Sequence, residues 1–209
     1  MKKIISVLMF SAIFALNIAA SDAGQSPIVA MQSTIDSVLE MMRDKSLSVP
    51  DKKEERRAKI SAQISERFHF EEMSKRSLAK HWRKRTPDEK AEFIKIFSDL
   101  LEASYISKIE AYTDEKVTYD KETIKSKGKY SVVKTTIVTK TVEIPIDYKL
   151  ISKKGKWWVY DVIIEGVSFV STYRSQYNRI IKKESFAALI DSMKNKLKEL
   201  NKDEVKAAS

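Results

Sequence analysis

The stretch IPIDYKLISKKGKWWVYDVII, residues 144–164, contains two runs of alternating apolar and polar residues on either side of a lysine-rich turn. Such alternation predicts two antiparallel strands, each with one face toward a core and one toward water. Gly155 is expected to take the left-handed position of a three-residue loop that it forms with Lys153 and Lys154. The segment therefore predicts a β-hairpin.

That loop length fixes a register, because side chains alternate between the two faces of a strand. With Ser152 opposite Lys156, the pairs expected on the covered face are Leu150 with Trp158, Tyr148 with Tyr160, Ile146 with Val162, and Ile144 with Ile164. The other face carries Asp147, Lys149 and Asp161 and is expected to lie in water. This pattern predicts a sheet covered on one side.

The hairpin belongs to a longer block of β-branched residues, 117–165, that contains a second lysine-rich turn at residues 126–128, also expected to be a three-residue loop. Apolar residues at helical spacing precede this block up to about Tyr112 and resume at Ser168. Thr86, Pro87 and Glu89 form a capping box that opens a long helix, which we expect to lie against the sheet. The fold class predicted is α+β, with helices packed on one face of a curved antiparallel sheet.

The N-terminus resembles a cleavable secretory signal. Lys2 and Lys3 precede an apolar run over residues 4–16, and small residues follow between Ala19 and Ala23. We expect cleavage between Ala20 and Ala23, which leaves residues 24–209 as a single domain outside the cytoplasm. An uncleaved N-terminal anchor is the alternative. Because the chain has no cysteine, neither a disulfide nor a lipid-modified cysteine is available, and we expect a soluble protein.

The formal charge is +10 and falls to about +9 without residues 1–23. In a cytoplasmic protein this charge would suggest nucleic acid as a partner. Export argues against nucleic acid and favours attraction to membrane surfaces and transient proximity to them. A lysine-rich solvated surface without a specific partner is the other interpretation.

Several kinds of chemistry have no matching motif. With four glycines in the chain, no glycine-rich phosphate loop is predicted. His69 and His81 are not spaced as metal ligands on one helix, so neither a metal nor a cofactor is expected. Ser168 is interpreted as a helix cap and not as a nucleophile. Asp147 and Asp161 are candidate acids of an isomerase or dehydratase, but the predicted register places both in water, whereas a general base needs a buried site near its substrate.

Large aromatic residues converge on the predicted inner face of the sheet. Tyr148, Trp158 and Tyr160 come from the strands, and apolar stripes over residues 97–112 and 170–177 come from the helices. An ordinary core explains most of these positions. A set this rich in tyrosine and tryptophan also often lines a cavity with a wet mouth.

Motifs along the chain resemble those of a known family. His81, Trp82, Arg83 and Lys84 precede Thr86 and Pro87, and the match continues through Tyr105, Ile109 and residues 144–148. The run from Trp158 to Asp161, through Glu165, Gly166 and Ser168, to Tyr173, Arg174 and Tyr177 is the most specific part. These segments closely resemble the MlaC family of periplasmic phospholipid carriers, also called the toluene-tolerance family.

This resemblance implies a fold related to the cystatin or NTF2-like group that encloses an apolar cavity for lipid tails. It implies a periplasmic phospholipid carrier that is not an enzyme. Its partners would be an outer-membrane lipoprotein–porin complex and the substrate-binding component of an inner-membrane ABC transporter, in the maintenance of outer-membrane lipid asymmetry. The residues predicted to contact acyl chains are Tyr105, Ile109, Ile146, Tyr148, Trp158, Tyr160, Val162, Val167, Val170, Tyr173 and Tyr177. Arg174 is predicted to attract headgroups weakly.

Two other functions stay open at this stage. An isomerase or dehydratase would need a buried carboxylate beside a small polar substrate. A periplasmic protein-binding module would have a closed core and an exposed apolar groove.

Overall fold

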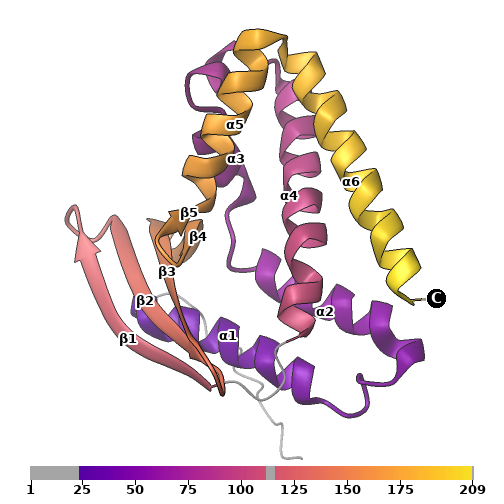
Figure 1. Cartoon of the computed structure of the whole chain (residues 1–209). Helices are drawn as coiled ribbons and strands as arrows, with labels where there is room; N and C mark the ends of the chain where they lie inside the picture. Colours follow the sequence, from indigo (N-terminus) through magenta and orange to yellow (C-terminus); the bar gives the residue numbers. More distant parts are fainter. Residues whose placement is uncertain (1–23, 112–115, 209) are drawn as a thin grey trace, which may run out of the picture.

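The computed structural model describes residues 24–111 and 116–208 of the chain (Figure 1). The predicted signal segment and the predicted helix end at Tyr112 lie outside these described residues. A block of strands separates two helical regions, as the sequence predicts. The α+β fold class is therefore confirmed.

The strands form a curved, open, five-stranded sheet in which every neighbouring pair is antiparallel and the spatial order follows the chain order. Short hairpin loops make this meander possible, because antiparallel neighbours need no crossover. The strands are β1 Lys116–Lys125, β2 Tyr130–Val138, β3 Glu143–Lys153, β4 Lys156–Ile164 and β5 Val167–Ser168.

The loop between β3 and β4 has two residues, so the predicted three-residue loop is wrong. Lys153 pairs with Lys156, and the loop residues Lys154 and Gly155 have φ angles of 52° and 75°. Two consecutive positive φ angles define a tight turn whose twist matches that of the strands. The loop between β1 and β2 also differs from the prediction, because residues 126–129 form a four-residue connection.

A bulge in β4 moves the register a second time. Lys149 pairs with Asp161 but Leu150 pairs with Val159, so Tyr160 is an extra residue on β4. All four predicted inward pairs are therefore wrong: the structure pairs Ile151 with Trp158, Leu150 with Val159, Tyr148 with Val162, and Ile146 with Ile164. Val159 and Val162 are both buried in the same core cluster, on the covered face.

The helices begin where the sequence places their caps. Ser26, Thr86 and Ser168 each accept a hydrogen bond from a backbone N–H of the first turn, and Thr86 forms the complete capping box with Glu89. The α-helices are α1 Pro27–Arg43, α2 Lys53–Ser65, α3 Phe70–Leu78, α4 Pro87–Glu110, α5 Phe169–Lys183 and α6 Phe186–Ala208, and the short 3₁₀ helices are η1 Pro50–Lys52 and η2 Ala79–Lys84. Among the residues described, no helix is long and apolar enough to cross a bilayer.

The prediction that the long helix lies against the sheet is wrong. Helix α4 packs on α6 and α3, and Figure 1 shows it standing apart from the strands. Helix α1 is the one that crosses the sheet, in contact with β1 and β2. The broad apolar face of α4 misled the prediction, because part of that face meets other helices.

The two larger core clusters stabilise the two sides of the molecule. One joins α3, α4, α5 and α6 around Phe93 and Phe97, and the other joins the sheet to α1 around Leu150 and Val159. Phe68 and Phe169 pack against both clusters. Between the clusters, the side chains leave space.

Candidate functional site

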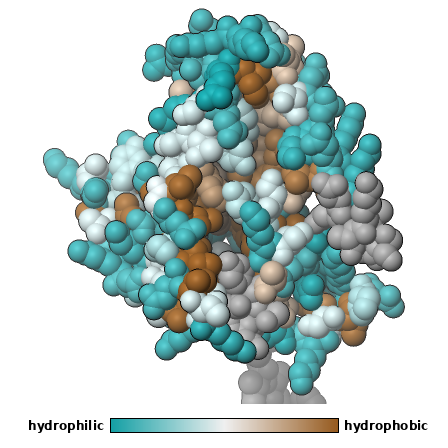
Figure 2. Space-filling model, viewed as in Figure 1, coloured by the Kyte–Doolittle hydropathy of each residue, from teal (hydrophilic) through white to brown (hydrophobic). Residues whose placement is uncertain are grey.

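A cavity of about 1020 Å³ lies between the inner face of the sheet and the helices. This volume is at the upper end of the ~300–1,000 Å³ typical of small-molecule sites. In Figure 2, hydrophobic residues flank the hollow between the strands and the helices. The sheet contributes Ile144, Ile146, Tyr148, Val162 and Ile164, and α4 contributes Leu100, Leu101, Tyr105 and Ile109.

Helix α1 forms one wall because polar contacts hold it on the sheet. The Tyr119 hydroxyl donates to Asp36 at 2.8 Å, and the backbone N–H of Ile28 donates to Glu122 at 2.9 Å. Buried Arg67 donates to Thr34 on α1 at 3.0 Å and to the Trp157 carbonyl at 2.8 Å. The wall is thus anchored at three points along the helix.

Helix α4 forms the opposite wall and is held at its C-terminal end by α2. Arg56 and Arg57 donate to the two carboxylate oxygens of Glu110 at 3.0 and 2.8 Å. Burial works against the charged form, but these hydrogen bonds outweigh it and hold the pKa of Glu110 below its usual value. Ile60 and Ile106 are buried together beside this clamp. The clamp fixes the C-terminal end of α4 to α2.

An aromatic contact at the cavity joins α4 to α5. The ring of Tyr105 on α4 stacks on that of Phe169 at the start of α5, with centroids 4.6 Å apart. The ammonium group of Lys108 lies 5.0 Å from the centre of the Tyr105 ring. Both aromatic residues and Lys108 border the cavity.

The tyrosine side chains of the lining remain neutral at ordinary pH. Burial raises the pKa of Tyr148 to about 12, and burial also raises the pKa of Tyr173 to about 12. The Tyr177 hydroxyl is buried and has no hydrogen-bond partner among the described residues. Charged lining residues are few: Glu102, Lys108, Glu165 and Lys196, all of them exposed. A lining of this kind suits an apolar ligand.

Most of the residues predicted to contact acyl chains line this cavity. They are Tyr105, Ile109, Ile146, Tyr148, Val162, Val167, Tyr173 and Tyr177. They come from β3, β4, β5, α4 and α5, which the fold brings together around one space.

Three of the predicted lining residues lie elsewhere. Trp158 makes an edge contact with His69, and the Arg76 guanidinium lies 4.0 Å from the centre of the Tyr160 ring. Both fall on the side of β4 away from the cavity because the loop is one residue shorter than predicted. Val170 is buried in the helical core cluster. Arg174 also lies outside the lining, where it donates to the Arg76 carbonyl at 3.0 Å.

The predicted site omits other lining residues, among them residues of α1 and α2. Helical spacing predicts an amphipathic helix for the α1 residues, and the highly charged segment 51–67 is typical of a solvent-facing helix, so neither is assigned to a cavity from sequence. An apolar stripe alone does not reveal whether it meets other side chains or an open space. These residues include Met31, Ile35, Val38, Leu39, Met42 and Ile64.

Asp161 contradicts the prediction that it lies in water, since only 3% of it is exposed. Its carboxylate accepts hydrogen bonds from the Ser168 hydroxyl at 2.7 Å and the Val170 N–H at 3.0 Å, and it pairs with Lys149 at 3.3 Å. These partners hold the start of α5 on the sheet, and Asp161 is absent from the cavity lining. Asp147 is half-exposed, with Lys134 at 3.7 Å. No cluster of metal-ligating side chains occurs within residues 24–111 and 116–208.

Helices and a curved antiparallel sheet around an open, mainly apolar cavity define an α+β ligand-binding protein whose ligand is largely apolar. The family model described as MlaC protein matches residues 32–195. The chain therefore belongs to the MlaC family.

The chain is also similar to two individual proteins, one by sequence and one by structure. The intermembrane phospholipid transport system binding protein MlaC of Haemophilus influenzae is 21% identical over 197 residues, which cover 92% of each chain. A phospholipid-binding protein from Ralstonia solanacearum, solved in complex with a phospholipid, is 19% identical. It aligns with a TM-score of 0.76 over 85% of this chain and 99% of its own. The structural likeness shows the shared fold.

Proposed function

We propose that this chain is a periplasmic phospholipid carrier that holds acyl chains in the cavity and leaves the headgroup in water. The observation that carries the proposal is the large, mostly apolar space between α4 and the sheet. Membership of the MlaC family and the names of the two relatives support the choice of phospholipid as ligand.

Physical chemistry explains why such a carrier is needed. Each methylene removed from water contributes about 0.8 kcal/mol, so a diacyl lipid crosses an aqueous gap very slowly unaided. A bilayer is as apolar as the cavity, so transfer between them changes the free energy little. The carrier alone therefore sets no direction, and its partners must do so. We assign these roles to an outer-membrane lipoprotein–porin complex and the substrate-binding component of an inner-membrane ABC transporter, in the maintenance of outer-membrane lipid asymmetry.

Mass spectrometry of an organic extract of the purified protein tests the ligand. We expect diacyl phospholipid in near-stoichiometric amount. An enzyme of the isomerase or dehydratase kind would carry no diacyl lipid, and neither would a protein-binding module with a closed core. The buried carboxylate that such an enzyme needs is present in Asp161, but its hydrogen bonds hold α5 in place. We therefore propose a non-enzymatic role.

Substitutions in the lining localise the ligand. Val162→Asp and Tyr148→Glu each put a charge at the sheet side of the cavity and should remove most of the co-purified lipid. Val142→Asp is the matched control, because Val142 is 55% exposed and lies outside the lining. Ser104→Phe on α4 fills part of the cavity without a charge and should also lower the lipid content. Folded variants with unchanged lipid content would rule out this cavity as the binding site.

A further inference from the structure

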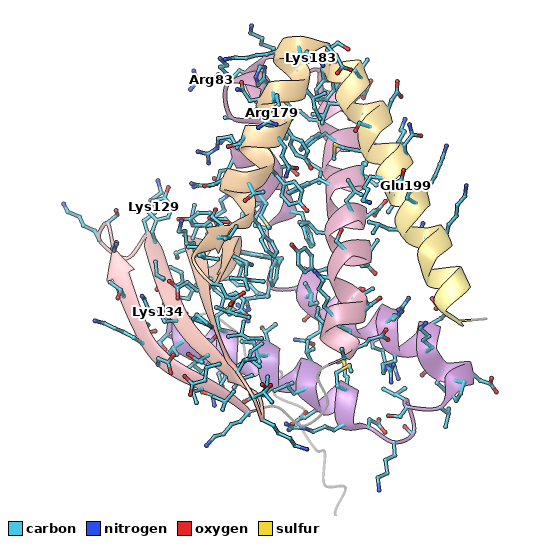
Figure 3. All side chains as sticks on the ribbon, viewed as in Figure 1. Arg83, Lys129, Lys134, Arg179, Lys183 and Glu199 are labelled. Carbon is cyan, nitrogen blue, oxygen red and sulfur yellow. The ribbon has the colours of Figure 1, made fainter. Side chains whose placement is uncertain are left out.

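Six exposed basic side chains gather at the end of the molecule away from β1 and β2. Three come from η2 and three from the last turns of α5, segments about a hundred residues apart in the sequence. In Figure 3, Arg83, Arg179 and Lys183 lie at this same end. We call this set the basic apex: Lys80, Arg83, Lys84, Arg179, Lys182 and Lys183.

Fixed contacts hold the two segments of the basic apex together. The His81 ring nitrogen Nε2 lies 3.0 Å from the Asn178 side-chain oxygen, which joins η2 to α5. Next to it, the Arg85 guanidinium lies 4.5 Å from the centre of the Phe186 ring and pairs with Glu89 at 3.1 Å. Because both segments are tied to the helical core, their charges stay close together in the folded protein.

In the part of the chain that the structure describes, the six side chains of the basic apex lack acidic partners, whereas several other exposed lysines have them. Lys59, Lys95 and Lys194 each form an ion pair with a carboxylate. Among the described residues, none of the six apex side chains forms such a pair. Lys182 and Lys183 follow the common preference for cations at a helix C-terminus, but that preference does not explain the three cations of η2. Their approach to α5 therefore concentrates positive charge at one place.

The composition of the basic apex indicates the kind of partner. Stable protein interfaces have apolar and aromatic centres and are depleted in lysine. The large exposed apolar residues of the described chain are Val29, Val49, Ile124, Val142 and Val167. None of them lies in η2 or α5, the two helices that carry the basic apex. Adsorption to anionic headgroups requires only clustered cations near the surface.

We propose that the basic apex docks this protein on the surface of a bilayer that contains anionic phospholipid. The apex is separate from the cavity lining, so this docking is independent of the proposed acyl-chain site. It would hold the carrier at the membrane by charge alone, and the attraction would weaken as salt screens it.

Co-sedimentation of the exported, processed protein with vesicles tests the docking. The vesicles contain either phosphatidylglycerol mixed with phosphatidylcholine or phosphatidylcholine alone. At about 0.01 M salt, where the screening length is about 30 Å, we expect binding to the mixed vesicles only. At about 1 M salt, where that length is about 3 Å, binding should be lost.

A triple variant localises the effect. Arg83→Gln with Arg179→Gln and Lys183→Gln should weaken binding to the mixed vesicles about a hundredfold, given the usual contribution of each cation near an anionic surface. The matched control removes the same charge from the β1–β2 loop region through Lys125→Gln, Lys127→Gln and Lys129→Gln, and should bind within a few-fold of the wild type. Circular dichroism verifies that both variants are folded.

Each remaining outcome counts against the proposal. Equal losses in the two triple variants would mean that total charge acts without a docking surface. An absence of wild-type binding at low salt would exclude the bilayer and leave an acidic protein surface as the partner of the apex. The cavity variant Val162→Asp should still sediment with the mixed vesicles, so failure of docking and failure of lipid loading are distinguishable.

Discussion

Tyr105 of α4 and Phe169 of α5 lie ring against ring across the cavity, with centroids 4.6 Å apart and ring planes inclined by 26°. Phe169 packs against both core clusters, so this stack connects the helical side of the molecule to the sheet side.

The first prediction concerns this stack. In a double-mutant cycle of Tyr105→Ala and Phe169→Ala, we expect a coupling free energy of about 0.5–1.5 kcal/mol in urea unfolding, as for other aromatic pairs. Each single variant should also release a fluorescent phospholipid faster, because the space between the walls widens. Tyr105→Phe keeps the ring and serves as the control. A coupling of zero would show that the two rings act independently.

The second prediction concerns Asp161. Asp161→Ala leaves the Val170 N–H, the Ser168 hydroxyl and the Lys149 ammonium without their acceptor, and should lower the free energy of unfolding by about 2–4 kcal/mol. Asp147→Ala is the control, since its pair with Lys134 is partly exposed and should change stability by less than about 1 kcal/mol. Urea midpoints measure both changes. Lipid loss in a folded Asp161→Ala protein would contradict the purely structural role.

The third prediction concerns alkaline pH. The pKa of Tyr148 is raised by burial from 10.0 to about 12, so the folded state favours the neutral phenol. The unfolded chain therefore loses this proton first, and the stabilisation is complete below pH 10 and disappears as the pH rises toward 12. Tyr148→Phe cannot ionise and should lose less stability over this interval. Thermal unfolding followed by circular dichroism measures the difference, and parallel losses in the two proteins would refute the assignment.

Local signals predicted the elements of this fold well. Ser26, Thr86 and Ser168 have short polar side chains that cap the adjacent helix, and such signals act within a few residues. Register was harder to predict. A lysine–glycine turn is compatible with two or three loop residues, and a bulge has no distinct sequence mark when the bulged residue is an ordinary Tyr160.

The sequence predicts the apolar character of the cavity but not the full set of residues that line it. Tyr148 and Val162 are on the covered face in both the prediction and the structure, because the loop and the bulge each shift the register and together restore their alternation. Trp158 precedes the bulge and Tyr160 forms it, so only the loop shift acts on these two residues and the predicted face is wrong for both. The position of α4 could not be read from its apolar face, since contacts with α6 and with an empty space look alike in sequence.

The bulge at Tyr160 gives β4 two sections whose alternation is offset by one residue. Val159 and Val162 are three positions apart, a spacing that would put them on opposite faces of a regular strand, yet both lie on the covered face because Tyr160 is extra. Deleting Tyr160 would leave them two positions apart, so both would stay inward, but the bend and the added twist that a bulge gives a strand would be lost. A single-codon deletion here would thus flatten this part of the sheet and reshape the ligand chamber without replacing any residue that touches it.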